Sequence, residues 1–466
     1  MNTRKLNEIL KEINYLISNK KFIEANELRK INNSLFKNEI NFFLQGLINS
    51  ENNKLEESIN YFKQSIEENS EYILSYLKLA DIYDKLDKLD IAEDYLKKAL
   101  LINFNSDVIH NSLGYNLYKQ KKIDESILSF KKAIQYNDQN YRVYFNLANS
   151  FIKKNDFNKA ISYYLKTIEI NKNSPEVYFY LSDAYKMIEN YELAIHYLKI
   201  SLQDKNTILR RDKINAKILE LYLITNNQDE YEKYMQYLIL HFPNNRRIAA
   251  TSTFISSQFS IINRHPFCPE PLNYIYKGSL ESYTDDYNLF LNSMINLINN
   301  LDFKWEPSGK TTRNGFGTTE NLSEKKIPLL INFEEMILKE LNKYYDQFKE
   351  DKIGYIHNWP KKMKFQSWSN RLKKQGYNIT HIHPTGWISG VFYLKIPKNI
   401  VGDEAGIEFS LHGDNYFIKE KNKILNSKLQ PQDGDIIFFP SSLFHRTIPF
   451  NSDEERICIA FDIFEG

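Results

Sequence analysis

Near the C-terminus, His381 and His383 are separated by a single residue. A third histidine, His445, follows an apolar run. Side chains on a β-strand alternate between its faces, so a strand here would point His381 and His383 the same way and Ile382 into the opposite layer. Neutral imidazole nitrogens bind divalent transition metals, and two such rings can share one ion. We therefore expect a metal centre with His381, His383 and His445 as candidate ligands.

The last expected strand, residues 456–464, adds a charge to this picture. Alternation puts Arg456, Cys458, Ala460 and Asp462 on one face and the large apolar residues on the other. The apolar face is then the buried one, and Arg456 points across the first face. An arginine aimed into a pocket indicates an anionic ligand.

The elements that must position these residues are strands separated by turn residues such as Gly376, Gly386, Gly402 and Gly434. The expected strands are 365–372, 378–383, 389–396, 406–411, 435–439 and 456–464. Apolar spacing predicts helices over 288–301 and 333–348, and residues 310–317 read as a polar loop. The sequence thus predicts a small β-barrel or sandwich buttressed by helices.

Breaker residues divide the 466-residue chain, which is too long for one core of roughly 250 to 300 residues. Of 15 Gly only Gly46 and Gly114 precede residue 250, and of 13 Pro only Pro175 and Pro243 do. Long helices tolerate that composition, whereas β-turns do not. We expect a multidomain α and β protein with an α-solenoid over 1–250 and a β-barrel domain over 251–466.

The first half repeats with a period of 34 residues. Three sets of small residues keep this spacing, and a large residue lies between the second and third sets. The first set is Gly46, Ala80, Gly114, Ala148 and Ser182. Small residues let helices approach closely, and large neighbours fill the space beside them.

This pattern resembles the tetratricopeptide repeat, a helix-turn-helix unit of that period. The clear units are 39–72, 73–106, 107–140, 141–174 and 175–208; a weaker unit near 212–245 and a helical pair near 5–38 would cap the stack. The resemblance implies a protein or peptide partner bound by the array. Tyr76, Tyr83, Tyr144 and Tyr178 read as helix-packing residues.

The C-terminal motifs resemble the 2-oxoglutarate and Fe(II)-dependent oxygenases of the prolyl-hydroxylase-like branch. The resemblance spans about residues 305 to 464 and rests on "THIHPTGWISGVFYLKIP", "AGIEFSLHG" and "GDIIFFPSSLFHRTIPFNSDEERICIAFDI". It implies a jelly-roll (double-stranded β-helix) fold with His381 and His445 as iron ligands. It also implies that Arg456, eleven residues after His445, binds the far carboxylate of 2-oxoglutarate. Tyr393 and Ser389 are further candidates for the co-substrate pocket.

His383 is where the chain departs from the wider superfamily, which usually has Asp or Glu there. Three neutral imidazoles leave Fe(II) one unit more positive than two imidazoles and one carboxylate do. Two arrangements stay open: His383 is itself a ligand, or it lies outside the metal sphere and Glu408 enters it. His412, His357 and His265 lack such support and read as structural.

The resemblance implies a hydroxylase that consumes dioxygen and 2-oxoglutarate. One alternative is a cupin-like metal-binding module, although a cupin would place Glu a few residues after the second His, where this chain has Pro384 to Trp387. Another is an interaction scaffold with a catalytically inactive barrel. Fold-level analogy does not identify the substrate, and the repeats favour a peptide or protein side chain.

Charge and cysteine content argue against two classes of protein, nucleic-acid binders and disulfide-stabilised proteins. The net charge of +2 comes from 61 basic and 59 acidic residues without a basic block, which argues against a nucleic-acid binder. Cys268 and Cys458 are the only cysteines, so a disulfide framework is not expected. No apolar stretch is long enough for a signal peptide or a membrane span. We therefore expect a soluble cytoplasmic protein.

Overall fold

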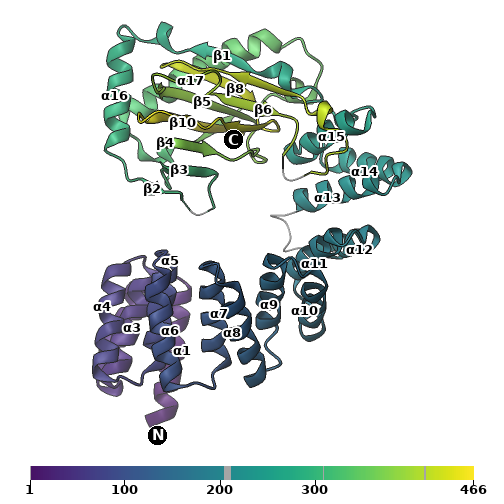
Figure 1. Ribbon diagram of the computed structural model, residues 1–466. Coiled ribbons are helices and arrows are strands. Elements are labelled where there is room, and N and C mark those ends of the chain that lie inside the picture. Colours follow the sequence, from purple (N-terminus) through teal and green to yellow (C-terminus); the bar gives the residue numbers. More distant parts are fainter. Residues whose placement is uncertain (1, 204–210, 308, 414–415) are drawn as a thin grey trace. The chain divides into compact units, whose positions relative to one another are not determined.

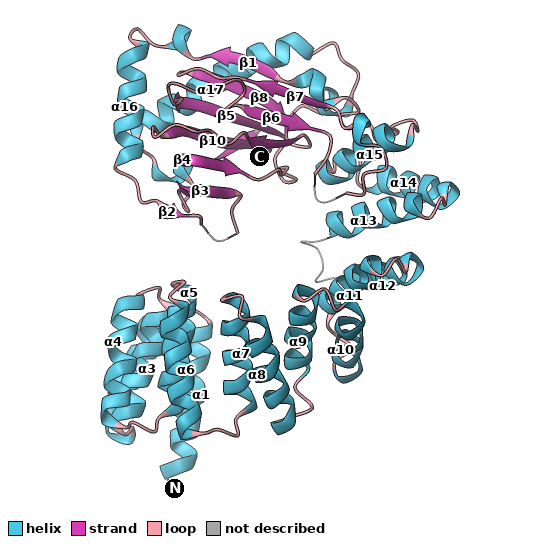
Figure 2. Cartoon of the chain, in the orientation of Figure 1, coloured by secondary structure: helices cyan, strands magenta, loops and turns pink. Residues whose placement is uncertain are grey.

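A computed structural model describes residues 2–203, 211–307, 309–413 and 416–466 (Figure 1). The chain divides into two compact units, Met1–Thr207 and Ile208–Gly466. Among the described residues, strands occur only in the second unit (Figure 2). This division between a helical and a strand-rich part confirms the predicted fold class.

The first unit is a series of helix pairs, and each of the five predicted repeats contains one pair. Its described helices are α1 (Asn2–Ser18), α2 (Phe22–Ile31), α3 (Asn38–Glu51), α4 (Leu55–Glu68), α5 (Ile73–Lys85), α6 (Leu89–Ile102), α7 (Asp107–Lys119), α8 (Ile123–Tyr136), α9 (Tyr141–Lys153), α10 (Phe157–Ile170), α11 (Pro175–Met187) and α12 (Tyr191–Gln203). The pairs run from α3 and α4 to α11 and α12. The predicted helical pair before them is α1 and α2.

Close helix contact explains the small residues of the repeat. A Cβ atom built on Gly46 would lie 2.7 Å from the ring of Phe62, and one on Gly114 would lie 2.7 Å from the ring of Phe130. Both rings are fully buried. The large residue therefore fills the space that the small residue leaves, as the spacing predicts.

Helices α13 (Arg211–Ile224), α14 (Gln228–His241) and α15 (Arg246–Phe259) belong to the second unit by their contacts. The Glu220 carboxylate accepts a hydrogen bond from the Phe417 amide at 2.5 Å, and the Thr251 and Tyr416 hydroxyls lie 2.8 Å apart. Such bonds explain why the compact units divide after Thr207 rather than near 250. The domain limits 1–250 and 251–466 remain predictions.

Two sheets form the rest of the second unit. The seven-stranded sheet has the order β1 (Tyr276–Ser279), β8 (Asp435–Pro440), β5 (Ile388–Lys395), β10 (Arg456–Glu465), β4 (Met363–Asn378), β3 (Thr312–Gly317) and β2 (Lys304–Trp305); the three-stranded sheet has the order β7 (Asn426–Leu429), β6 (Ile407–Ser410) and β9 (Phe444–Thr447). All the pairings are antiparallel. This β-rich region is consistent with a double-stranded β-helix.

Strand alternation separates two cores. Phe438 and Phe461 pack with α16 (Tyr287–Asn299) and α17 (Pro328–Phe348) on the outer face of the large sheet (Figure 1). Phe439, Cys458 and their neighbours pack against the small sheet. The predicted faces of residues 456–463 are therefore correct, and Arg456 points between the sheets. The short helix α18 (Gly354–His357) precedes β4.

Two local predictions were wrong, and one strand was missed. Residues 379–383 are not a strand, because β4 continues to Asn378 and His381 then makes only an isolated bridge to His445. Residues 312–317 form β3 instead of a polar loop, since their backbone pairs with β4. Strand β9, which carries His445, was not predicted. The expected helices over 288–301 and 333–348 correspond to α16 and α17.

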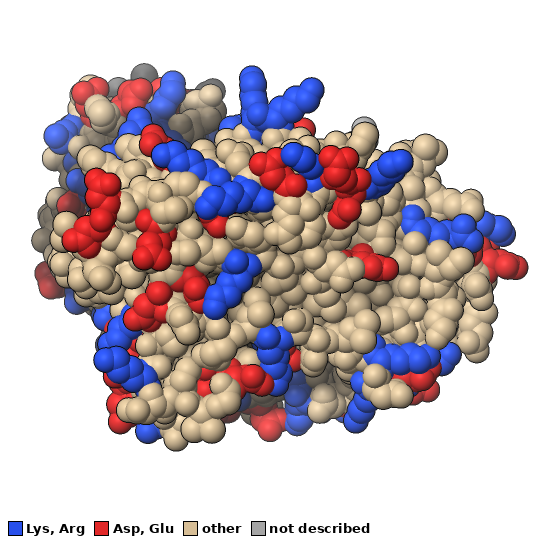
Figure 3. All heavy atoms as spheres, turned by 90° about the horizontal axis from the view of Figure 1, so that it is seen from above, with Lys and Arg blue, Asp and Glu red and all other residues tan. Residues whose placement is uncertain are grey.

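The surface carries both signs of charge. On the face drawn in Figure 3, basic and acidic side chains are interspersed, with broad uncharged areas between them. Mixed charges of this kind match the small net charge of the sequence. Among the helices that the structure describes, none is long and apolar enough to cross a membrane.

Candidate metal centre

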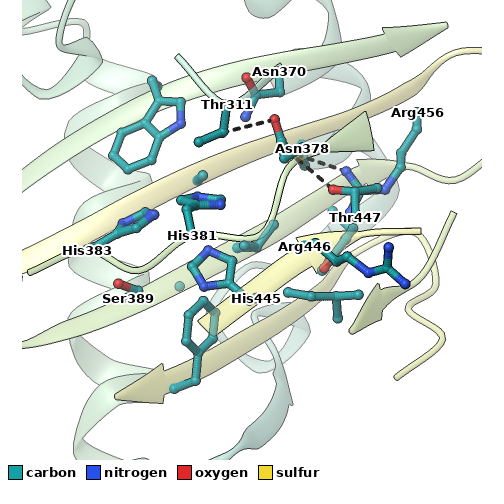
Figure 4. Close-up of a pocket in the computed structure, with 18 residues that line it drawn as sticks. Thr311, Asn370, Asn378, His381, His383, Ser389, His445, Arg446, Thr447 and Arg456 are labelled. Atoms are coloured by element: carbon teal, nitrogen blue, oxygen red, sulfur yellow. Dashed lines mark hydrogen bonds between the residues drawn. The ribbon is translucent and has the colours of Figure 1, made fainter. Parts of the chain in front are cut away.

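The three candidate histidines converge on one point between the sheets (Figure 4). Their ring centroids are 4.3 Å apart for His381 and His445, 4.9 Å for His381 and His383, and 5.0 Å for His383 and His445. One nitrogen of each ring lies within 4.8 Å of the other two, and within the described residues this is the group of three found suitable for a metal. Reciprocal backbone hydrogen bonds between His381 and His445, 3.1 and 3.0 Å long, hold two of the rings together.

Hydrogen bonds fix the direction of each ring. The Nδ1 atoms of His381 and His445 lie 2.7 Å from the Ile379 carbonyl and 3.1 Å from the Leu443 carbonyl. The Nδ1 atom of His383 lies 2.5 Å from Oδ1 of Asp462. Because carbonyl and carboxylate oxygens accept, each Nδ1 is the donor, and each Nε2 keeps its lone pair. The rings therefore offer three Nε2 ligands.

Burial keeps two of these rings neutral. Burial and the neighbouring His383 lower the pKa of His381 to about 3. Burial beside the other two rings lowers the pKa of His445 well below the usual value. Both rings are therefore unprotonated at neutral pH, which is the form that binds a metal.

An uncompensated cation lies in the same pocket. Arg456 is 2% exposed; its Nε donates to the Ala405 carbonyl at 2.9 Å and its Nη1 lies 3.4 Å from the Cys458 sulfur. None of the described carboxylates pairs with it. The guanidinium lies 4.9 Å from the centre of the Tyr393 ring, and the Tyr393 hydroxyl is buried without a partner among the described residues. Burial raises the pKa of Tyr393, so this hydroxyl stays protonated and can donate to an anion.

Two other candidate residues have defined contacts. The Ser389 hydroxyl donates to Oδ1 of Asp462 at 2.7 Å, so it lies beside His383 in the pocket wall. The Glu408 carboxylate accepts a hydrogen bond from Nε of Arg446 at 2.7 Å, and Nη2 of Arg446 forms an ion pair with the same oxygen at 2.5 Å. Phe409, its neighbour on β6, faces the core between the sheets, and Glu408 therefore faces the other way. The alternative of Glu408 as a metal ligand does not fit this geometry.

Asp462 is a site residue to which the sequence interpretation gave no role. Alternation along β10 already placed it on the same face as Arg456. Its hydrogen bond to His383 could not be read from the sequence, because the two residues are 79 positions apart. His265 and His412 lie outside the group of three rings, and His357 is exposed at the end of α18.

Comparison with protein families agrees with both parts of the chain. A family model described as "Putative 2OG-Fe(II) oxygenase" matches residues 366–462, which contain the three histidines and Arg456. Tetratricopeptide-repeat models match residues 41–72, 73–106 and 141–174. The chain carries tetratricopeptide repeats followed by a 2OG-Fe(II) oxygenase domain. No curated protein matches it.

Solved structures similar to the chain include several repeat proteins. The C-terminal part of a TPR repeat-containing protein from Cytophaga hutchinsonii is 15% identical, with 52% of this chain and 98% of that chain covered and a TM-score of 0.43. PilF of Pseudomonas aeruginosa is 19% identical, with 45% and 94% covered and a TM-score of 0.38. YrrB, described as a TPR protein with an unusual peptide-binding site, is 18% identical, with 40% and 94% covered and a TM-score of 0.32.

The oxygenase family implies Fe(II) and 2-oxoglutarate, and the residues present fit both. Three Nε2 atoms with lone pairs form a donor set that suits Fe(II). The unpaired guanidinium of Arg456 and the orphaned hydroxyl of Tyr393 suit a carboxylate. The two sets of groups line one pocket, with Arg456 and the three rings at opposite sides of the view in Figure 4.

Proposed function

We propose that the oxygenase domain is an Fe(II)- and 2-oxoglutarate-dependent dioxygenase that hydroxylates a side chain of a protein or peptide. One observation carries the proposal: three Nε2 lone pairs converge in the same pocket as a buried arginine that has no anionic partner among the described residues. A site that held a metal alone would have no use for that buried charge.

His381, His383 and His445 would hold the metal through Nε2. Their outward Nδ1–H bonds prevent the rings from turning, so the lone pairs remain directed at one point. Such a set would hold Fe(II) without using Arg456 or Tyr393, which would stay available to a co-substrate.

Arg456 and Tyr393 would bind the far carboxylate of 2-oxoglutarate. The guanidinium supplies charge and the hydroxyl supplies a neutral donor. Val391, Ile407 and Phe439 also line this pocket, and their apolar side chains would help to keep water from the co-substrate. When bound, Fe(II) couples reduction of dioxygen to oxidative decarboxylation of 2-oxoglutarate, which yields succinate, carbon dioxide and a hydroxylated product.

The repeats would recruit the substrate or a partner protein. A cavity in the first unit is lined by apolar residues of α5 and α6 and by polar groups of α5, α7 and α9, among them Asn111 and Asn146. Asn146 donates to Asn111 at 3.0 Å, and side-chain amides of this kind can bond the backbone of an extended peptide.

Turnover tests the proposal. The full chain is incubated aerobically with Fe(II), 2-oxoglutarate and a peptide mixture, and succinate and peptides that gain one oxygen atom are measured. His445→Ala is expected to abolish both products, while His357→Ala, which removes an exposed histidine, leaves them unchanged. Equal succinate release from the unaltered protein and His445→Ala would exclude the dioxygenase and favour an inactive metal-binding module.

A further inference from the structure

We infer that Asp462 is a positioning residue that supplies, through His383, the negative charge missing from the three-histidine metal site. This inference rests on the proposed function. When a neutral histidine replaces an anionic carboxylate as a ligand, the site with its bound dication carries one more unit of positive charge. Asp462 is bonded to Nδ1 of His383, the residue that stands where the wider superfamily has Asp or Glu.

The three rings differ in their acceptors. His381 and His445 donate to neutral backbone carbonyls, at 2.7 and 3.1 Å, whereas His383 donates to the Asp462 carboxylate at 2.5 Å. A carboxylate bonded to Nδ1–H increases the electron density that Nε2 offers to a metal. Only the His383 ring can therefore pass negative charge to the ion.

Within the part of the chain that the structure describes, the charge of Asp462 meets no cationic group except the His383 ring. Its side chain is 8% exposed, and among the described residues its recorded ion pair is the one with His383. Ser389, the other donor to Oδ1, is neutral. A buried carboxylate without a cation is costly, so a divalent ion beyond the His383 ring would stabilise it.

The backbone is shaped around this carboxylate. A Cβ atom on Gly386 would lie 2.7 Å from the Ser441 hydroxyl and 3.3 Å from Cγ of Asp462. The loop after His383 therefore closes over Asp462, where a larger residue would force it away. The donation from Ser389 fixes the carboxylate from its other side.

Cobalt(II) binding by the full chain tests the inference without turnover. Asp462→Asn keeps the shape and can still accept from His383 and Ser389, but it removes the charge. We expect its Co(II) affinity to fall about 10- to 100-fold and its visible Co(II) bands to shift. Asp462→Glu should recover part of the affinity. The matched charge-loss control is Asp453→Asn, whose carboxylate is 93% exposed, and it should bind Co(II) normally.

The outcomes separate the two proposals. The metal-free Asp462→Asn protein should unfold at a temperature at least as high as the unaltered protein does, because it no longer buries an uncompensated charge, whereas a purely structural role would lower its midpoint. Equal Co(II) affinity in the unaltered protein and Asp462→Asn overturns the inference and leaves the proposed function standing. If Asp462→Asn fails to fold, affinity of Asp462→Glu no better than that of His383→Ala overturns it. Absence of Co(II) binding to the unaltered protein removes the metal site and both proposals.

Discussion

In each residue of the site, some polar atoms bond to the protein and others are left available for a ligand. Each histidine bonds one nitrogen to an oxygen of the protein and keeps the other, and Arg456 bonds two nitrogens without meeting an anion. Buried polar groups normally find partners within the protein. The histidine nitrogens and the guanidinium that lack such partners among the described residues therefore indicate where ligands bind.

Tyr393 provides a prediction at this scale. Tyr393→Phe keeps the ring beneath Arg456 and removes a hydroxyl that bonds nothing in the described structure. We expect the KM for 2-oxoglutarate to rise about 10- to 100-fold, because a hydrogen bond to a charged group contributes roughly 1.5–3 kcal/mol. Succinate release measured against 2-oxoglutarate concentration gives this KM. An unchanged KM would show that the hydroxyl does not touch the co-substrate.

At the scale of the elements, charged groups join neighbouring repeats. Glu93 on α6 is almost buried and accepts from Lys122 at 2.9 Å and Gln120 at 2.7 Å, in the turn between α7 and α8, as well as from Lys97. Burial alone would raise the pKa of Glu93, but these hydrogen bonds outweigh it and lower the pKa to about 2. The bonds therefore stabilise the ionised carboxylate, and with it the contact between repeats.

This lowered pKa predicts a pH-dependent stability. The contribution of Glu93 is full above the unfolded pKa near 4.5 and is lost as the pH falls toward 2. Glu93→Gln should lower the free energy of unfolding by about 1–3 kcal/mol at pH 7, and the difference should shrink between pH 4.5 and 2. Urea unfolding followed by circular dichroism measures both quantities. Glu57→Gln, in a pair with both side chains more than half exposed, should change little; a pH-independent difference for Glu93→Gln would contradict the account.

The sequence predicted the elements with a regular repeat better than the irregular ones. The 34-residue spacing located five helix pairs, because every unit buries the same kind of contact, such as Gly114 against Phe130. Strand β3 and the segment 379–383 were misread. Their conformation depends on pairing with β4 and on the bridge to His445, and these are contacts between residues far apart in the chain.

In the candidate site, too, contacts between residues far apart in the chain could not be predicted from the sequence. Residue type and order were enough to select His381, His383, His445 and Arg456, which line one pocket in the structure. The pairing of Glu408 with Arg446 could not be predicted without the register between β6 and β9. The contact between Asp462 and His383 likewise required the packing of β10 beside the loop after the histidines. Sequence patterns give the face of a strand, and only the fold gives its neighbours.

On the scale of the whole molecule, a repeat array and an oxygenase domain share one chain. The repeats form a helical unit with its own cores, and the oxygenase domain has separate cores on the two faces of its large sheet. We propose that the first unit recruits the substrate and that the second unit carries out the chemistry. In the second unit we propose a three-histidine centre that binds a metal ion and 2-oxoglutarate together.

Anaerobic spectroscopy of the full chain tests whether metal and 2-oxoglutarate bind together. Fe(II) and 2-oxoglutarate are added together to the unaltered protein, to Arg456→Ala and to the control Arg264→Ala, which removes a half-exposed arginine paired with Glu232. We expect a weak visible charge-transfer band from chelated 2-oxoglutarate in the unaltered protein and the control, and loss of this band in Arg456→Ala. A spectrum of the unaltered protein that does not change when 2-oxoglutarate joins Fe(II) would contradict the proposal.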